Sequence, residues 1–159
     1  AIRWLTVPRF IQLAIDFFAL GIPVHARHRS PVATARLGLR VMWRVVAASA
    51  VGTSHTATGA ECQDSCLALV EKVPAKPPLL TIFVADGAGS AIYGGTGAEL
   101  AIEAASTFVG NHYAQTEFAL NHHWAIECVQ AVRARIYAAA DQRNTKVRDY
   151  ACTFLGVLA

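Results

Sequence analysis

The sequence predicts one mixed α/β (α+β) domain, and three observations indicate that class. The chain has 159 residues, the size of a single domain, and its 54% hydrophobic and 16% charged content predicts a packed core rather than disorder. Short apolar runs of strand length end at turns that contain glycine or proline. Two longer segments, 97–109 and 116–143, repeat apolar residues at helical spacing.

The first 41 residues are predicted to lie outside this domain. They hold six arginines and one acidic residue, whereas the remainder holds eight basic and ten acidic residues, so the net charge of +3 does not indicate nucleic-acid binding. Residues 10–24 are apolar but contain Asp16 and break at a glycine and a proline. A membrane-spanning helix needs about 20 apolar residues, so we expect no membrane span. Residues 25–40 lack periodicity and are expected to be disordered.

The only methionine, Met42, directly precedes the first strand-like run. We therefore expect residues 1–41 to be upstream sequence or a disordered leader, with the natural start at Met42 and the domain in residues 42–159. A genuine N-terminal anchor or linker is the alternative.

The cysteines predict reduced thiols rather than a metal site. They stand at positions 62, 66, 128 and 152 and form no Cys-x-x-Cys pair. Zinc sites need such pairs in matched sets, and free buried thiols are usual in cytoplasmic proteins. We therefore expect a cytoplasmic protein.

The predicted strands follow one another along the chain. Residues 43–51 are rich in valine and alanine and are predicted as the first strand, which a polar loop at 52–64 follows. A second strand covers 65–70, and a proline-containing connection leads to the third at 79–85. The last strand, 150–159, ends without polar residues. Its unpaired edge would be exposed, so we expect the chain to be truncated within a domain.

Each predicted helix has one apolar stripe. In the helix at 97–109, Leu100, Ala104 and Phe108 lie four positions apart, and Gly110-Asn111 is the expected C-cap. In the helix at 116–143, the stripe consists of Trp124, Cys128, Val132 and Ile136.

Two carboxylates stand where predicted strands begin and end. Asp64 opens the strand at 65–70, and Asp86 follows the strand at 79–85 directly before Gly87. If these strands pair, both carboxylates reach one edge of the sheet. Together with a glycine carbonyl they would form an oxygen-rich site that suits Mg²⁺ or Mn²⁺. The residues alone favour a turn cap for Asp86, and a strand-start cap is the alternative for Asp64.

Several sequence elements occur in the order found in one known family. Asp86-Gly87-Ala88-Gly89 is similar to an Asp-Gly-x-Gly signature, and residues 49–55 with Gln63-Asp64 are similar to a first strand and metal-binding loop. Residues 152–158 resemble a threonine-containing strand that follows two helices. In these features residues 42–159 resemble about the first half of the metal-dependent Ser/Thr protein phosphatases of type 2C, in particular a bacterial branch.

The resemblance implies roles for individual residues. Asp86 would bridge two metal ions, the Gly87 carbonyl would ligate one of them, and Asp64 would contribute through bound water. Thr153 would lie near the metals. The implied cofactor is a pair of Mn²⁺ or Mg²⁺ ions.

The sequence also departs from the family pattern. His55 falls near the position of an arginine that grips the substrate phosphate, and imidazole is a weaker, pH-dependent anion ligand than guanidinium. Gln63 replaces a glutamate, which removes one negative charge. Ala88 replaces a histidine that is proposed as a general acid in some members, so either the leaving group would take its proton from water or activity would be lower.

The family resemblance implies a four-layer helix–sheet–sheet–helix sandwich that is incomplete at the C-terminus here. It implies metal-dependent hydrolysis of phosphoserine and phosphothreonine on proteins, with phosphoprotein substrates and a Ser/Thr kinase as the source of those substrates. Further metal-binding aspartates belong to the family's second half. We therefore expect the 159-residue chain by itself to have little or no activity.

Two other functions stay open at this stage. A pseudophosphatase or regulatory binding module would keep the fold without catalysis, and Gln63 and Ala88 favour it. The third interpretation, a nucleotide-binding protein, is supported only by the glycine-rich turn, and that turn lacks the lysine of a phosphate-binding loop.

Overall fold

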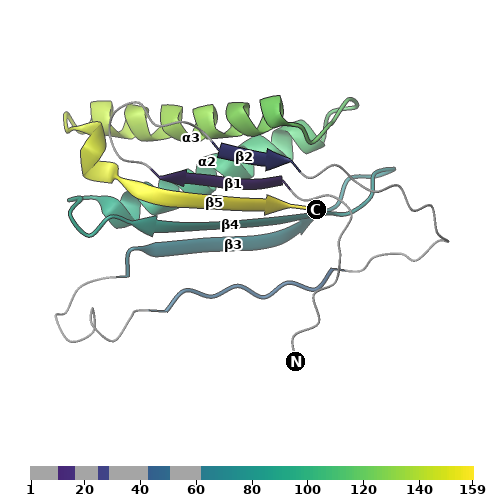
Figure 1. Cartoon of the computed structure of the whole chain (residues 1–159), viewed down its shortest axis with the longest axis horizontal. Helices are drawn as coiled ribbons and strands as arrows, with labels where there is room; N and C mark the ends of the chain where they lie inside the picture. The colour runs from purple at the N-terminus through teal and green to yellow at the C-terminus, as the bar shows by residue number, and fades with distance from the viewer. Residues whose placement is uncertain (1–10, 17–24, 29–42, 51–61) are drawn as a thin grey trace.

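The computed structural model describes residues 11–16, 25–28, 43–50 and 62–159. Its sheet has five strands in the order β2-β1-β5-β4-β3, and every neighbouring pair is antiparallel (Figure 1). The strands are β1 (Ile11–Asp16), β2 (His25–His28), β3 (Asp64–Glu71), β4 (Leu79–Gly87) and β5 (Cys152–Leu158). The helical elements are α2 (Gly94–Tyr113), α3 (His122–Gln142) and the 3-10 helix η1 (Val147–Tyr150). The predicted mixed α/β class is confirmed.

Strand β4 shows why the sheet has one covered face. Its odd-numbered positions are buried, and Phe83 and Ala85 are each 1% exposed, whereas Val84 on the opposite face is 44% exposed. On β5 the ring of Phe154 is fully buried and lies 5.3 Å from the ring of Phe83. Side chains alternate between the two faces of a strand, so the apolar residues of β4 and β5 gather on one face. Helices α2 and α3 pack on that face.

Helix α3 presents the predicted stripe to the core. Trp124, Cys128, Val132 and Ile136 are all buried, as the four-residue spacing predicted. The helix begins at His122 rather than at residue 116, because the Asn121 side chain caps it by accepting a hydrogen bond from the backbone N–H of Trp124 at 2.9 Å.

Helix α2 is longer than the sequence predicted. It starts at Gly94 and runs to Tyr113, so the expected C-cap at Gly110-Asn111 is wrong and Gly110 lies inside the helix. The Nζ of Lys76, in the β3–β4 connection, donates to the carbonyl oxygens of Tyr113 and Gln115. These bonds satisfy carbonyls at the end of α2, which supports about one further turn beyond the predicted end.

Two expectations about strands need correction. Residues 43–50 form no strand, and Val46 in their middle is 98% exposed, because β-propensity alone provides no partner for a ladder. Within residues 1–41, which were expected to be a leader, β1 and β2 join the sheet. Strand β5 consequently has β1 on one side and β4 on the other, so its predicted unpaired edge is wrong. The domain boundary at residue 42 stays a prediction.

The membrane expectation concerns residues 10–24, of which the structure describes only 11–16, as strand β1. No helix among the described residues combines the length and apolar character that a membrane span requires.

Candidate functional site

One row of polar residues crosses three strands at one end of the sheet. Asp64 on β3 lies directly opposite Asp86 on β4, and Asp86 lies directly opposite Thr153 on β5. Residues that face each other in antiparallel strands share one face of the sheet. All three residues are exposed, and they lie on the face away from the helices. The structure thus brings together three of the residues that the sequence singled out.

Hydrogen bonds hold the ends of these strands together. The backbone N–H of Asp86 donates to the hydroxyl Oγ1 of Thr153 at 3.2 Å, and that hydroxyl lies 3.5 Å from the carbonyl oxygen of Asp86. On the other side, the N–H of Gly87 donates to the carbonyl oxygen of Gln63 at 3.0 Å. Gln63 therefore adjoins the metal-ligand candidates through its backbone.

The turn after Asp86 depends on close backbone approach. A Cβ atom on Gly87 would lie 2.4 Å from the carbonyl carbon of Gly94, the first residue of α2. Only glycine fits this contact without displacing the helix start. The N–H of Ala88 donates to the carbonyl oxygen of Ala151 at 2.8 Å. The Gly-rich turn is therefore fixed to both the helix and the strand that flank the polar row.

The donor atoms of this row suit a hard divalent cation. Mg²⁺ is commonly bound by one or two carboxylates and keeps several waters, and Asp64 and Asp86 offer that number of carboxylates with the Gly87 carbonyl beside them. Among the residues that the structure describes, no three His, Cys, Asp or Glu side chains gather to form a fuller metal cage. The donor atoms of the described residues are therefore of the kind that Mg²⁺ or Mn²⁺ accepts, with water as the remaining ligands.

The sequence did not indicate that a thiol adjoins this row. Cys152 lies opposite Gly87, on the buried face, and is 2% exposed. Burial, and secondarily the negative charge of Asp86, raise the pKa of the Cys152 thiol to about 11. Burial therefore disfavours the thiolate of Cys152, which is the form in which a cysteine acts as a nucleophile.

An apolar surface continues from the polar row along the same face. The next positions inward are Cys66, Val84 and Leu155, which face one another across β3, β4 and β5, and Val84 and Leu155 are each 44% exposed. The following row consists of Ala68, Ile82 and Val157. This surface, which we call the open face, lies opposite the helix-covered face.

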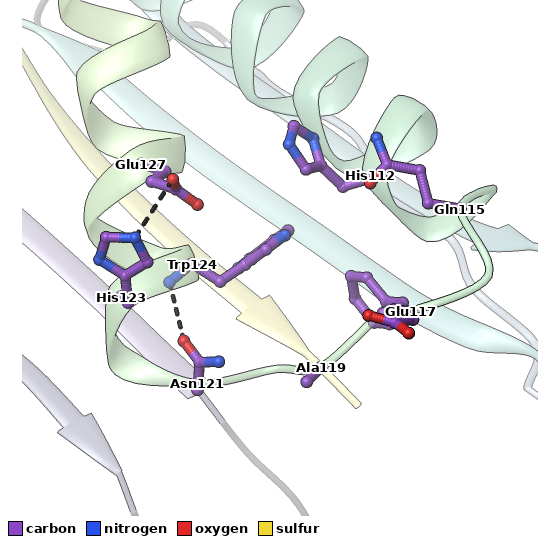
Figure 2. A pocket seen from close by; sticks show the side chains of 9 residues that line it. His112, Gln115, Glu117, Ala119, Asn121, His123, Trp124 and Glu127 are labelled. Atoms are coloured by element: carbon purple, nitrogen blue, oxygen red, sulfur yellow. Dashed lines mark hydrogen bonds and ion pairs between the residues drawn. The ribbon is translucent and has the colours of Figure 1, made fainter.

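A hollow of about 200 Å³ lies at the other end of the molecule, where α2 ends and α3 begins (Figure 2). Figure 2 shows the side chain of Trp124 extending from α3 toward His112 at the end of α2. The indole N–H of Trp124 is buried and has no hydrogen-bond partner among the residues that the structure describes. The Glu127 carboxylate on the rim lies 3.3 Å from His123. The end of α2 is bonded to Lys76, which lies in the connection before the start of β4, whereas Asp86 lies near the end of β4. The hollow and Asp86 are therefore at opposite ends of that strand.

The predicted phosphate ligand His55 lies outside the described residues, and the metal roles of Asp64, Asp86, Gly87, Gln63 and Thr153 stay predictions. The structure places the last five at one sheet end. The signal that found Asp64 and Asp86 was their position relative to an apolar run, whereas Gln63 and Thr153 were singled out only by the family resemblance.

Comparison with known proteins agrees with this geometry. A model of the protein phosphatase 2C family matches residues 51–159. Over 117 residues, 74% of this chain, the sequence is 43% identical to the serine/threonine-protein phosphatase 3 of Escherichia coli (strain K12). The aligned region is 46% of that protein, so the chain spans about half the length of this curated relative. No solved structure shows significant similarity. The family model covers more than half of the chain, which confirms the resemblance: the chain belongs to the protein phosphatase 2C family.

Proposed function

We propose that the whole protein hydrolyses phosphoserine and phosphothreonine on proteins with the help of Mn²⁺ or Mg²⁺. The observation that carries this proposal is the pairing of Asp64 directly opposite Asp86, with Thr153 next in the row. Family membership and the similarity to a protein named as a Ser/Thr phosphatase support it. Phosphoprotein substrates, a Ser/Thr kinase as their source, and a cytoplasmic location belong to this proposal.

The carboxylates of Asp64 and Asp86 would hold the metal ions, and the Gly87 carbonyl oxygen would be a further ligand of one metal ion. Bound at this place, the ions would neutralise phosphate charge and lower the pKa of water. Thr153 would orient the strand end, because its hydroxyl receives the Asp86 N–H at 3.2 Å. Ala88 has no proton to give, so solvent protonates the leaving alkoxide.

The open face supports the four-layer architecture as part of the same proposal. Val84 and Leu155, each 44% exposed, form apolar surface beside the polar row. Burying apolar surface stabilises by about 25 cal/mol per Å², so a second sheet on this face would be favourable. That sheet would bring further carboxylates to Asp64 and Asp86. We propose that activity requires it, and that residues 1–159 alone bind metal weakly.

The test measures metal binding and turnover separately. Mn²⁺ affinity is measured by calorimetry, and hydrolysis of a phosphothreonine peptide by phosphate release, in the chain with any downstream sequence that its gene encodes. Asp86→Asn is expected to weaken Mn²⁺ binding at least tenfold and to abolish turnover, because one ligand charge is lost. The matched control is Glu99→Gln, which neutralises an exposed carboxylate on α2.

Two results would contradict the proposal. Unchanged Mn²⁺ affinity and turnover in Asp86→Asn would remove the metal role of this residue. Tight phosphopeptide binding with no metal-dependent turnover in the wild type would instead favour the pseudophosphatase or regulatory binding module.

A further inference from the structure

A cationic turn joins α3 to η1. Arg143, Lys146 and Arg148 are all exposed and fall within six residues. Two acidic residues adjoin them, Asp141 in the last turn of α3 and Asp149 in η1. We refer to Arg143, Lys146 and Arg148 as the basic turn.

The basic turn lies at the same end of the sheet as the polar row. Figure 1 shows the link between α3 and β5 beside the end of β4 and the start of β3. Tyr93, just before α2, donates its N–H to the carbonyl oxygen of Asp149 at 2.7 Å. The guanidinium of Arg143 lies 5.4 Å from the centre of the Tyr93 ring. Backbone and side-chain contacts therefore connect the basic turn to the turn that follows Asp86.

The charges of the basic turn are only partly compensated. The Asp149 carboxylate accepts a hydrogen bond from the backbone N–H of Lys146 at 3.2 Å and lies 4.0 Å from Nε of Arg148. The Asp149 side chain is 18% exposed, whereas that of Arg148 is 68% exposed. Within residues 141–149, which the structure describes, solvent consequently meets the three cations together with the exposed carboxylate of Asp141.

These cations stand away from the phosphate position. The Tyr93 ring lies 5.1 Å from the ring of Tyr150, which is buried in the core on the helix side of the sheet. Arg143 therefore sits at the helix side of this end, whereas Asp64 and Asp86 face the open side. A peptide whose phosphate reached the polar row would therefore have to run around this end of the sheet for residues beside the phosphorylated one to meet the basic turn.

We propose that the basic turn binds acidic side chains that flank the phosphoserine or phosphothreonine of the substrate. The protein would then prefer acidic phosphopeptides over neutral or basic ones. This inference rests on the proposed phosphatase function, and it adds a substrate class to it.

The expected size of the preference follows from exposed ion pairs. Each such pair changes affinity about two- to threefold, so three pairs change it about tenfold. Salt screens exposed charges, with a Debye length of about 3 Å at 1 M, so the preference is expected to shrink as ionic strength rises.

The experiment compares two variants with the same loss of charge. The test variant is Arg143→Ala/Lys146→Ala/Arg148→Ala, and the control is Arg44→Ala/Lys72→Ala/Arg133→Ala, whose three cations are also exposed. Both are made in the chain with any downstream sequence that its gene encodes. Substrates are two phosphothreonine peptides of equal length, one with glutamates and one with glutamines around the phosphothreonine. Readouts are kcat/KM and the fluorescence anisotropy of the labelled peptides.

In the wild type, kcat/KM is expected to be about tenfold higher for the glutamate peptide. The test variant should lose this ratio while keeping its rate on the glutamine peptide, and the control should keep both. An unchanged ratio in the test variant, or equal loss in the control, would overturn the inference. So would duplex DNA that binds the basic turn more tightly than the glutamate peptide and displaces it.

Failure of the proposed function gives a different pattern. If no peptide is hydrolysed, anisotropy still decides the inference. About tenfold weaker binding of the glutamate peptide by the test variant alone would support the acidic-peptide surface, and equal binding by wild type and test variant would refute it.

Discussion

Gly97 is the position at which a single methyl group is expected to damage the fold most selectively. It lies in the first turns of α2, and a Cβ atom there would lie 2.1 Å from the carbonyl oxygen of Tyr150 and 2.8 Å from its carbonyl carbon. Ordinary contacts begin near 3.4 Å. Gly97→Ala therefore forces α2 and η1 apart by roughly 1 Å, because a backbone carbonyl cannot rotate away as a side chain can.

The magnitude follows from two opposing effects. Alanine is a better helix former than glycine by about 1 kcal/mol, which favours the substitution. Overpacking in a core costs about 1–3 kcal/mol, and a clash between backbone elements belongs at the upper end. The free energy of unfolding is therefore expected to fall by about 2 kcal/mol in Gly97→Ala.

The matched control is Gly110→Ala in the same helix. A Cβ atom there would meet only Oε1 of Glu71, at 3.8 Å, so only the helix propensity changes and stability should rise by about 0.5–1 kcal/mol. Urea unfolding followed by circular dichroism measures both variants. Equal stability of the two variants would refute the close approach between α2 and Tyr150.

Three other predictions concern buried and capping groups. Burial raises the pKa of the Cys128 thiol to about 12 and, with the charge of Asp86, that of Cys152 to about 11. As pH rises, the two thiols therefore ionise in the unfolded chain before they ionise in the folded one, which favours unfolding. The free energy of unfolding from urea titrations should fall by about 1.5 kcal/mol between pH 8 and 9.5, and in Cys128→Ala this fall should be half as large. Trp124→Phe removes an indole N–H that has no partner in the described part of the chain. It should therefore cost under about 1 kcal/mol in urea unfolding, against about 3–5 kcal/mol for Trp124→Ala. Lys76→Met removes the donor to the last carbonyls of α2 and should cost about 1–2 kcal/mol, with faster amide exchange confined to the end of that helix.

The hairpin of β3 and β4 and the stripe of α3 were predictable from sequence for the same physical reason. Each has a regular pattern of apolar residues that indicates its type of secondary structure. Asp64 and Asp86 bound the two strands, and a short proline-rich connection allows only an antiparallel return. The register that places the two aspartates opposite each other follows from that connection, so the candidate site was predictable in outline.

Other elements depend on partners that are distant in the sequence. The segment Ile11–Asp16 alternates apolar and other residues, yet it becomes a strand by pairing with β5, more than 130 positions later. Residues 43–50 have a similar composition and form no strand. Local propensity does not separate these cases, because a ladder needs a partner edge. The proximity of Cys152 to Asp86 likewise arises only when β4 and β5 pair.

The register of the sheet couples the candidate site to the hydrophobic core. On β4 the ring of Phe83 is 1% exposed against the helices, and Asp86 faces the open side. A slip of β4 by one residue would exchange the two faces, bring Asp86 toward the core and expose Phe83. Losing the burial of one such ring costs about 1.5–3 kcal/mol, and an unpaired buried carboxylate costs more. The packing of Phe83 against Phe154 therefore helps to fix the position of Asp86 opposite Thr153. Core substitutions on this face of β4 should consequently weaken Mn²⁺ binding as well as stability.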